Sequence, residues 1–299
     1  ALHAARFVEA GARRGVDFGC GIGADSLAFT LAGLDVAAIE SDPVAALYAA
    51  ANAPEAKVTC ADGLAAELPE ADAIWLDPAR RAEDGRRISS PERWTPPFSR
   101  ALSLARGFPL AGIKVAPGIA YHALPPRAFV EWISERGQLL EAVVWLGMGT
   151  GRAATVDGER LDSGAKTADE PAVFVAPRAL GPLLFEPDPA IVRSGGIAHL
   201  CEEHGLAPVS EGIAYLSGEA APPHCAAFEV LDVIAPEPKR IKRSLAAHGI
   251  GRAEVKKRGM EVDVAAMAKR LSGSGGDAGV VLFSPVLGRH RAIVARRKR

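Results

Sequence analysis

Val16-Asp17-Phe18-Gly19-Cys20-Gly21-Ile22-Gly23 is the stretch that decides the fold of this chain. It predicts a short buried strand that runs into a tight glycine turn, and then a helix from about residue 25. Glycines at alternate positions allow positive φ angles and let a ligand lie against the backbone. The N–H groups at the start of the helix then point at the same place. The stretch therefore predicts a nucleotide-type site at the carboxyl end of the first strand of an open α/β sheet.

Two classes of ligand use such a glycine turn. The residues from Gly19 to Ala24 satisfy the pattern G-x-G-x-x-A of dinucleotide-binding proteins, which alone is a weak signal. The same region satisfies acid-x-G-x-G-x-G, with Asp17 as the acid, and in this form it resembles motif I of the class I S-adenosylmethionine (SAM) methyltransferases. An acid at this position suits a ligand with an ammonium group better than one with a pyrophosphate. A glycine turn that binds no ligand is the third interpretation.

The composition is that of an ordinary globular protein, with 48% of the 299 residues hydrophobic and 24% charged. Four cysteines without C-x-x-C spacing indicate neither a metal site nor a disulfide framework, and a cytoplasmic location is expected. No apolar run approaches the roughly 18 residues that span a bilayer, and no signal-peptide pattern is present, so no membrane partner is expected. Because Ala1 already stands in a helix-like pattern, we expect an upstream segment to be missing.

Short apolar runs alternate with amphipathic stretches from residue 16 to about 176. This alternation predicts an α/β fold, a parallel sheet with helices on both faces. The expected strands are 16–18, 35–39, 57–59, 73–76, 112–115, 142–146 and 172–175. The expected helices are 25–32, 43–52, 98–106 and 127–136. Seven strands at this spacing match the Rossmann-like sheet of the methyltransferases.

Acidic residues follow the second and third expected strands. Glu40 stands about 20 residues beyond the glycine turn, where an acid accepts hydrogen bonds from the ribose hydroxyls of a dinucleotide or an adenosyl ligand. Asp42 precedes a proline and is expected to cap the next helix rather than to bind a ligand. Asp62 either forms an Asx turn before Gly63 or, by resemblance to the class I methyltransferases, meets the adenine amino group. Taken with Asp17 and Glu40, it favours the ligand.

The fourth expected strand runs into Asp77-Pro78-Ala79-Arg80-Arg81, which resembles motif IV of methyltransferases that act on nitrogen or on nucleobases. A carboxylate and carbonyls there can accept hydrogen bonds from an amino group and fix its lone pair for in-line transfer. The common motif is Asp/Asn-Pro-Pro-aromatic, from which Ala79 and Arg80 depart. Asp-Pro-x-Arg is closer to the uracil-C5 methyltransferases, but these need a cysteine after the fifth strand, where this chain has Lys114-Val115-Ala116-Pro117-Gly118. We therefore predict methylation of nitrogen.

A polar stretch, 82–97, follows this motif and carries Arg86, Arg87, Arg93 and Trp94. At the rim of the site, such a loop suits a substrate cover. The alternative is an ordinary exposed loop with Trp94 tucked back onto the sheet.

The C-terminal part of the chain is basic. Residues 236–299 hold 16 Lys and Arg against 5 Asp and Glu, a net charge of +11, whereas the other residues hold 19 against 31, a net charge of −12. A polyanion such as nucleic acid is the expected partner of the basic part. A solvated basic face, or docking of the two halves, is the alternative. An expected helix from residue 238 carries Lys239, Arg240, Lys242 and Arg243 in its first turns, where the macrodipole disfavours cations, and an anionic ligand would explain them.

Prolines mark a linker after residue 176, and a small α+β region is expected beyond it. We expect a helix from Pro189 to before Gly205, and another at 263–271. The expected strands are 212–216, 226–234, 252–257, 280–287 and 292–296. The region is basic and poor in aromatic residues, so contacts to RNA phosphates are expected rather than base readout.

The whole chain resembles the bacterial class I SAM-dependent methyltransferases that carry a C-terminal THUMP-like domain. Besides the motifs above, the matching stretches are Phe185-Glu186-Pro187-Asp188-Pro189 and Glu254-Val255-Lys256-Lys257-Arg258-Gly259. The resemblance implies three parts: a methyltransferase domain at 1–178, a ferredoxin-like segment at 181–235 and a basic THUMP-like domain at 236–299. It also implies SAM as the cofactor and tRNA as the partner.

The expected function is therefore methyl transfer from SAM to RNA, at a nucleobase nitrogen and without a metal. A non-catalytic SAM-binding RNA-binding protein, an NAD-linked oxidoreductase, and an enzyme with a small-molecule or protein acceptor are the alternatives. The residues expected to bind SAM are Asp17, Gly19, Gly21, Gly23, Glu40 and Asp62. The residues expected at the reacting centre are Asp77, Pro78 and Arg80. The residues expected to contact the substrate are Arg81, Arg86, Arg87, Lys114, Lys239, Arg240, Lys242, Arg243, Lys256, Lys257 and Arg258.

Overall fold

The computed structural model describes residues 2–80, 85–86, 88–273 and 276–298. The chain divides into two compact units, Ala1–Pro171 and Ala172–Arg299, and each is described by itself. Within the described ranges, no helix is both long and apolar enough to cross a membrane.

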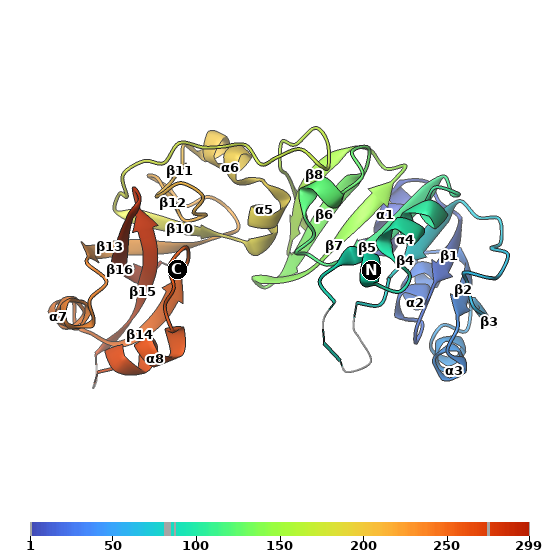
Figure 1. Cartoon of the computed structure of the whole chain (residues 1–299), viewed down its shortest axis with the longest axis horizontal. Helices are drawn as coiled ribbons and strands as arrows, with labels where there is room; N and C mark the ends of the chain where they lie inside the picture. The colour runs from blue at the N-terminus through green and yellow to red at the C-terminus, as the bar shows by residue number, and fades with distance from the viewer. Residues whose placement is uncertain (1, 81–84, 87, 274–275, 299) are drawn as a thin grey trace. The chain divides into compact units, whose positions relative to one another are not determined.

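The first unit is built on a mixed nine-stranded sheet with the order β3-β2-β1-β4-β5-β7-β6-β8-β9 (Figure 1). Its strands are β1 (Arg14–Phe18), β2 (Asp35–Glu40), β3 (Lys57–Cys60), β4 (Ala73–Leu76), β5 (Leu110–Val115), β6 (Phe129–Glu135), β7 (Gln138–Leu146), β8 (Gly151–Val156) and β9 (Glu159–Asp162). Its helices are α1 (Leu2–Glu9), α2 (Ala24–Leu31), α3 (Pro43–Asn52) and α4 (Phe98–Ala105), with short 3₁₀ turns η1 (Pro91–Arg93) and η2 (Tyr121–Ala123).

Strands β1 to β5 are parallel, and β1 lies between β2 and β4. The strand order therefore reverses between β1 and β4, which is where an open α/β sheet leaves a crevice for ligands. Helices α2, α3 and α4 begin within one residue of the predicted positions, because the glycine turn and the prolines that start them are local signals.

Two predictions for this sheet were wrong. Residues 127–136, expected as a helix, contain strand β6, which pairs antiparallel with β7. Arg136 and Gly137, with φ of 50° and 74°, make the two-residue turn between these strands. The stretch is rich in β-branched and aromatic residues, and both of its faces are buried. Residues 172–175, expected as a strand, have no regular structure, and Val173 and Phe174 are exposed. The sheet thus has nine strands rather than seven.

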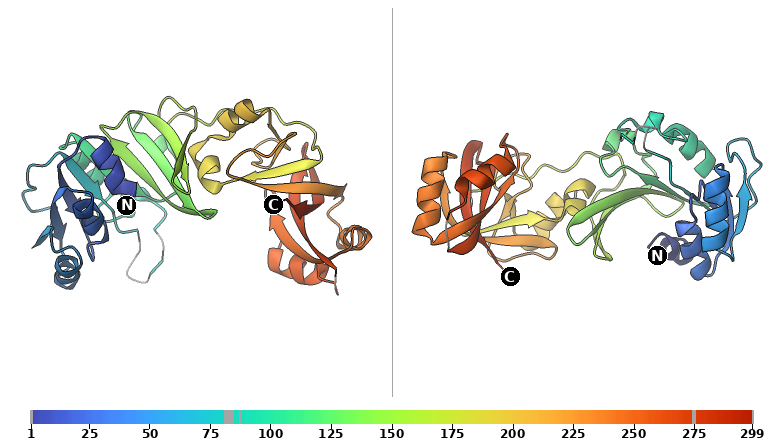
Figure 2. Two further views of the ribbon diagram at one scale, coloured as in Figure 1. Left: turned by 180° about the vertical axis from the view of Figure 1, so that it is seen from behind. Right: turned by 90° about the horizontal axis from the view of Figure 1, so that it is seen from below.

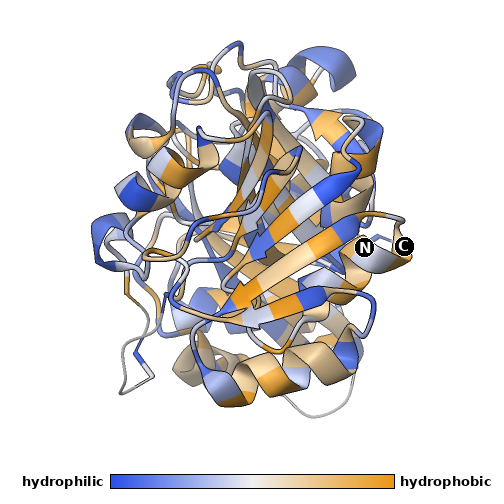
Figure 3. Cartoon of the chain, turned by 90° about the vertical axis from the view of Figure 1, so that its right-hand side faces the viewer, coloured by the Kyte–Doolittle hydropathy of each residue, from blue (hydrophilic) through white to orange (hydrophobic). Residues whose placement is uncertain are grey.

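Aromatic side chains fill the core of the first unit. Phe7 of α1 packs edge-to-face on Phe29, Trp75 and Trp145, with ring centroids 5.5–6.5 Å apart. Gly112 of β5 makes room for the two tryptophans, since a Cβ there would lie 2.6 Å from Trp145 and 2.7 Å from Trp75. In Figure 3, which faces the β3 side of the first unit, hydrophobic residues run along the strands and the helices that cover them.

The second unit has a seven-stranded sheet with the order β11-β12-β10-β13-β16-β15-β14. Its strands are β10 (Leu183–Pro187), β11 (Ala207–Pro208), β12 (Leu216–Ser217), β13 (Cys225–Ile234), β14 (Ile250–Lys257), β15 (Asp277–Val286) and β16 (Arg289–Arg297). Its helices are α5 (Pro189–Ser194), α6 (Ile197–His204), α7 (Pro238–Ala247) and α8 (Val264–Leu271).

Three features of this unit differ in detail from the expected pattern. Residues 212–215, expected to belong to a strand, lie outside any strand, and β12 begins only at Leu216. Gly195, with φ of 81°, and Gly196 divide the expected helix at 189–204 into α5 and α6. Strand β13 pairs with both β10 and β16, so the expected segments 181–235 and 236–299 contribute to one sheet. Helices α7 and α8 lie side by side on one face of it (Figure 2).

Candidate active site

A cavity of about 220 Å³ opens at the carboxyl ends of β1 to β4. Four residues that the sequence predicted line it, one after or at the end of each strand: Gly19, Glu40, Asp62 and Asp77. The apolar part of the lining includes the side chains of Phe18, Ile39 and Leu64. Carboxylates and apolar groups therefore meet at the switch point of the sheet.

The turn between β1 and α2 depends on three glycines with positive φ: Gly19 (72°), Gly21 (56°) and Gly23 (84°). A Cβ at Gly19 or Gly21 would meet nothing within 4 Å, so these two residues are needed for their backbone angles. A Cβ at Gly23 would lie 2.9 Å from Cα of Ala49. Gly23 therefore also lets α2 begin close against α3, and Gly19 is the glycine of the three that lines the cavity.

Glu40 ties the glycine turn to the end of β2. Its Oε2 accepts a hydrogen bond from the N–H of Gly21 at 2.8 Å, and its Oε1 accepts one from the N–H of Asp42 at 2.9 Å. The hydroxyl of Ser41 also donates to Oε1, at 3.3 Å, so Oε2 is the oxygen that can accept a further hydrogen bond and hold the turn and a ligand hydroxyl together. Asp62 forms the predicted Asx turn, its Oδ1 accepting from the N–H of Leu64 at 2.9 Å, and it lines the cavity as well.

Asp17 lies beneath the glycine turn and is 2% exposed. The hydroxyl of Ser26 donates a hydrogen bond to its Oδ2 at 2.5 Å. Burial raises the pKa of Asp17 to about 7, against the effect of the Ser26 hydrogen bond, and the charge of Asp25 adds to the rise. The structure thus places this carboxyl against the first turn of α2 rather than in the lining of the cavity.

The segment after β4 follows the cavity wall. Asp77 and Ala79 line the cavity, and Pro78 between them is buried. Ala79 forms two backbone hydrogen bonds with Thr95, of 2.8 and 3.1 Å, which bring Thr95 to the same wall. Trp94 is 2% exposed, so the alternative in which it is tucked into the interior is the one observed.

The predicted arginines near this wall are only partly described. Arg80 is half-buried, and its carbonyl accepts the N–H of Ile88 at 2.8 Å. Arg86 is exposed. Arg81 and Arg87 lie outside the described residues.

A chain of ion pairs runs from the cavity into the first unit. Nζ of Lys114 on β5 lies 3.0 Å from Oδ2 of Asp77 and 3.3 Å from Oε2 of Glu141 on β7. Oε1 of Glu141 lies 2.7 Å from Nε2 of His3, and Nδ1 of His3 lies 3.0 Å from Oδ1 of Asp25. Lys114, expected from the sequence to touch the substrate, therefore contacts the carboxylate of Asp77.

Contacts between opposite charges set the protonation states of the residues in this series of ion pairs. Burial on its own would lower the pKa of His3, but hydrogen bonds to Asp25 and Glu141 raise it to about 9, so the ring is a cation at neutral pH. Although burial opposes it, His3 lowers the pKa of Asp25 and of Glu141. Burial would lower the pKa of Lys114, but the carboxylates of Asp77 and Glu141 raise it above its usual value. Negative and positive groups thus alternate from Asp77 to Asp25.

Two of the predicted cations of the second unit contact the same acid, Glu186. Lys256 of β14 pairs with Glu186 of β10, and a guanidinium nitrogen of Arg258 lies 3.7 Å from the same carboxylate. Arg258 also donates to the carbonyl of Ala214 at 3.2 Å and lies over the ring of Tyr215, 5.0 Å from its centroid. Two stretches that carried the family resemblance therefore meet in one internal contact.

The other predicted cations of this unit are exposed. Lys239, Lys242 and Arg243 stand on the outer side of α7, whose Ile241, Ser244 and Leu245 are buried. Within the same helix region, Arg240 pairs with Glu237 at 3.0 Å. Lys257 lies 3.7 Å from Glu261, which is fully exposed. Of the predicted cations in the described part of this unit, those that are exposed and have no ion pair are therefore the three on α7.

The sequence is similar to known proteins over most of its length. Residues 225–297 match the family described as THUMP domain-like. An uncharacterized S-adenosylmethionine-dependent methyltransferase of Mycobacterium tuberculosis, found in strains CDC 1551 and H37Rv, is 33% identical over 271 residues. That match covers 85% of this chain and 72% of the mycobacterial protein.

The fold is also known. The solved structure of a protein from Porphyromonas gingivalis W83 that carries a provisional methyltransferase name superposes with a TM-score of 0.76. The match covers 100% of this chain and 80% of that chain, at 16% sequence identity. It supports the α/β methyltransferase fold.

The residues of the cavity fit SAM, the cofactor named for the mycobacterial relative. Glu40, Asp62 and Asp77 are hydrogen-bond acceptors, which suits the ribose hydroxyls and amino groups of this molecule. Phe18 and Ile39 supply apolar surface of the kind that a purine ring contacts. Within the described ranges, no group of three or more His, Cys, Asp or Glu side chains could hold a metal ion.

Proposed function

Because this chain belongs to the S-adenosylmethionine-dependent methyltransferases and carries a THUMP-like domain, we propose that it methylates RNA, at a nucleobase nitrogen and with tRNA as the RNA class. The observation that carries the proposal is the position of Asp77. This carboxylate follows a buried strand, lines the cavity and shares it with the glycine turn and with Glu40.

SAM, when bound, supplies an electrophilic methyl group. Glu40 accepts hydrogen bonds from the ribose hydroxyls, and Asp62 accepts one from the adenine amino group. Gly19 and Gly21 hold the turn in the shape that admits the ligand, and the N–H of Gly21 is already engaged by Glu40. Asp17 fixes the start of α2 through Ser26. The residues that line the cavity and the hydrogen bonds that they already make support these roles.

Asp77 orients the acceptor. Its Oδ2 is occupied by Lys114, and its Oδ1 is the oxygen that we assign to the amino group of the base. A hydrogen bond from that amino group directs the nitrogen lone pair at the methyl group. SAM bound in this cavity would supply the methyl group to that lone pair, and Asp77 would hold the amino group while the nitrogen loses its proton to solvent. Positioning supplies most of the rate, so no separate acid or base is required.

The basic part of the second unit holds the RNA. Family membership makes RNA the expected partner, and the net charge of +11 over residues 236–299 supplies attraction to phosphates. Lys239, Lys242 and Arg243 on α7 are the cations that we assign to phosphate contacts, since they are exposed. Lys256 and Arg258 hold Glu186 instead. We place the reaction in the cytoplasm, where the four free cysteines would stay reduced.

Transfer of radioactive methyl from labelled SAM to bulk tRNA tests the proposal, with a small-molecule fraction and total protein as alternative acceptors. Wild type should label RNA, and Asp77→Ala should lose labelling while it still binds SAM. If SAM binds but no fraction is labelled, the protein is a SAM-binding module that does not transfer methyl groups. Labelling of protein alone would refute RNA as the acceptor.

A further inference from the structure

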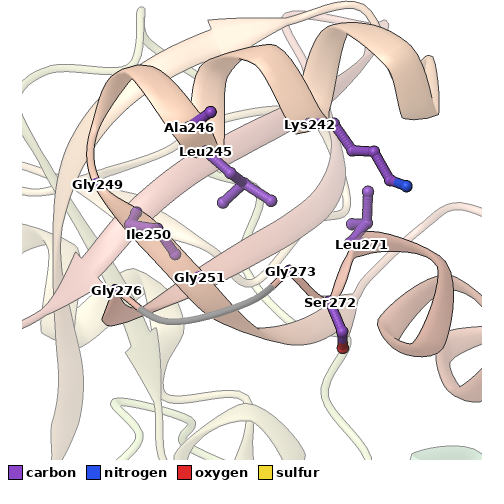
Figure 4. A pocket seen from close by; sticks show the side chains of 10 residues that line it. All are labelled: Lys242, Leu245, Ala246, Gly249, Ile250, Gly251, Leu271, Ser272, Gly273 and Gly276. Carbon is purple, nitrogen blue, oxygen red and sulfur yellow. The ribbon is translucent and has the colours of Figure 1, made fainter.

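The second unit contains a cavity of about 430 Å³, which is larger than the cavity lined by Asp77. It lies where the ends of α7 and α8 meet the start of β14 (Figure 4). The side chains of Leu245, Ile250 and Leu271 form its inner wall, and Lys242 extends along one side. Its volume is within the roughly 300–1,000 Å³ that small-molecule sites occupy.

Glycine backbone forms much of the remaining wall, at Gly249, Gly251, Gly273 and Gly276. The N–H of Gly273 donates to the carbonyl of Gly251 at 3.0 Å, and the N–H of Asp277 donates to that of Gly249 at 2.9 Å. A Cβ at Gly276 would lie 2.6 Å from the oxygen of Gly249, so this close approach requires glycine. These contacts hold the described glycine part of the wall in place, and this part presents backbone rather than side chains.

Charge distinguishes the open side of this cavity from its inner wall. Lys242 is exposed and is the charged side chain in the described lining. It stands on α7 between the exposed cations Lys239 and Arg243. An occupant should therefore carry an anionic group beside Lys242 and a flat, largely uncharged part against Ala246 and the glycine backbone. A nucleotide has this division, with a phosphate at one end and a base at the other.

We propose that this cavity binds one unstacked nucleotide of the RNA, with the base inside it and the adjoining phosphate at Lys242. The proposal rests on the proposed RNA substrate and adds base contact to a region expected to touch only phosphates. Proteins commonly recognise RNA through bases that are splayed out of single-stranded segments. The carbonyl oxygens of Gly249 and Gly251 each accept one backbone hydrogen bond and have a second lone pair for a donor on the base edge. The lining of this cavity belongs to the second unit, whereas Asp77 belongs to the first, and we assign the cavity to RNA binding alone.

The test uses the full chain, a fluorescein-labelled 12-nucleotide single-stranded RNA of mixed sequence, a 12-base-pair RNA duplex, and anisotropy as the readout. Ala246→Phe fills the cavity without a change in charge. Ala247→Phe is its matched control, because Ala247 is also exposed on α7 but does not line the cavity. Lys242→Ala and Lys239→Ala form a second pair, equal in charge and differing in whether the residue lines the cavity.

Ala246→Phe should raise the Kd for the single strand roughly tenfold, the scale of losing one base contact. Ala247→Phe should change it less than about twofold, and Lys242→Ala should weaken binding more than Lys239→Ala does. Duplex binding should be the same for Ala246→Phe and Ala247→Phe. If Ala246→Phe lowers the melting temperature, the comparison of Lys242→Ala with Lys239→Ala still tests whether the cavity contributes to binding of the single strand.

Two results would overturn the proposal. Equal effects within each pair would show that charge alone binds the RNA and that the cavity takes no base, while the RNA function stands. Failure of the wild type to bind either RNA would refute both the proposed RNA function and the proposed nucleotide site.

Discussion

Nζ of Lys114 lies 3.0 Å from Oδ2 of Asp77, the carboxylate just after β4 that lines the cavity proposed to bind SAM. Lys114 is itself held by Glu141, with Nζ 3.3 Å from Oε2. The lysine thus holds the carboxylate of Asp77 through Oδ2 and leaves Oδ1 for a substrate. We therefore propose that Lys114 is a positioning residue that acts through Asp77.

Lys114→Met should lower kcat for RNA methylation by about 10- to 100-fold, the usual effect of misplacing a reacting group by about 1 Å. The Kd for SAM should change less than about twofold, because Lys114 does not line the cavity. Lys114→Arg keeps the charge and should restore part of kcat. Single-turnover methylation and calorimetry measure the two quantities. A rise in KM for RNA with unchanged kcat would instead show that Lys114 touches the substrate, as its sequence position indicated.

Stability should fall at alkaline pH because of His3. Its contacts with Asp25 and Glu141 raise its pKa from 6.5 to about 9, so the folded state binds this proton more tightly than the unfolded state does. The stabilisation is complete below pH 6.5 and is lost as the pH rises through 9. A shift of this size corresponds to about 3 kcal/mol. Urea unfolding of wild type between pH 6 and 10 measures it.

The control for that measurement is His3→Gln, in which the decline between pH 6.5 and 9 should disappear. His122→Gln replaces an exposed histidine of the same unit and should leave the decline in place. The ion-pair chain would be contradicted if the free energy of unfolding of the wild type did not change up to pH 9 and varied with pH as that of His3→Gln does.

The cavity could be predicted because its carboxylates follow strands. Glu40, Asp62 and Asp77 each stand at or just beyond the end of a short apolar run, and parallel strands end at one edge of a sheet. The ion-pair chain could not be predicted, because it joins residues 3, 25, 114 and 141, which no local spacing relates. Asp25 had one signal, its place in the first turn of α2, but that position is equally explained by the helix dipole.

The error at residues 127–136 has a different cause. The stretch Phe129-Val-Glu-Trp-Ile-Ser-Glu135 is buried on both faces, because neighbouring strands and covering segments enclose it. A run buried on both faces loses the alternation that marks a half-exposed strand. The prediction therefore placed a helix here, which continued the alternation of strands and helices. The structure instead has the antiparallel pair of β6 and β7.

Glu40 and Asp17 should contribute differently to SAM binding. Glu40→Ala removes the acceptor of the Gly21 N–H and of a ligand hydroxyl, and should raise the Kd for SAM by about tenfold or more. Asp17→Asn keeps an acceptor for the Ser26 hydroxyl and lies below the turn, so it should change the Kd less than about threefold. Calorimetry at pH 7.5 compares them. Equal losses would show that Asp17 contacts SAM, as motif I predicts.

The glycines of the turn should differ in their effect on stability. Both Gly21→Ala and Gly23→Ala force a Cβ into a left-handed backbone conformation, which costs about 1–2 kcal/mol. At Gly23 the new Cβ would also lie 2.9 Å from Cα of Ala49, and overpacking of this kind costs about 1–3 kcal/mol more. Urea unfolding should therefore show a larger loss for Gly23→Ala than for Gly21→Ala. A loss at Gly21 as large as that at Gly23 would mean that α2 and α3 are not packed as described, since the backbone term alone is common to both variants.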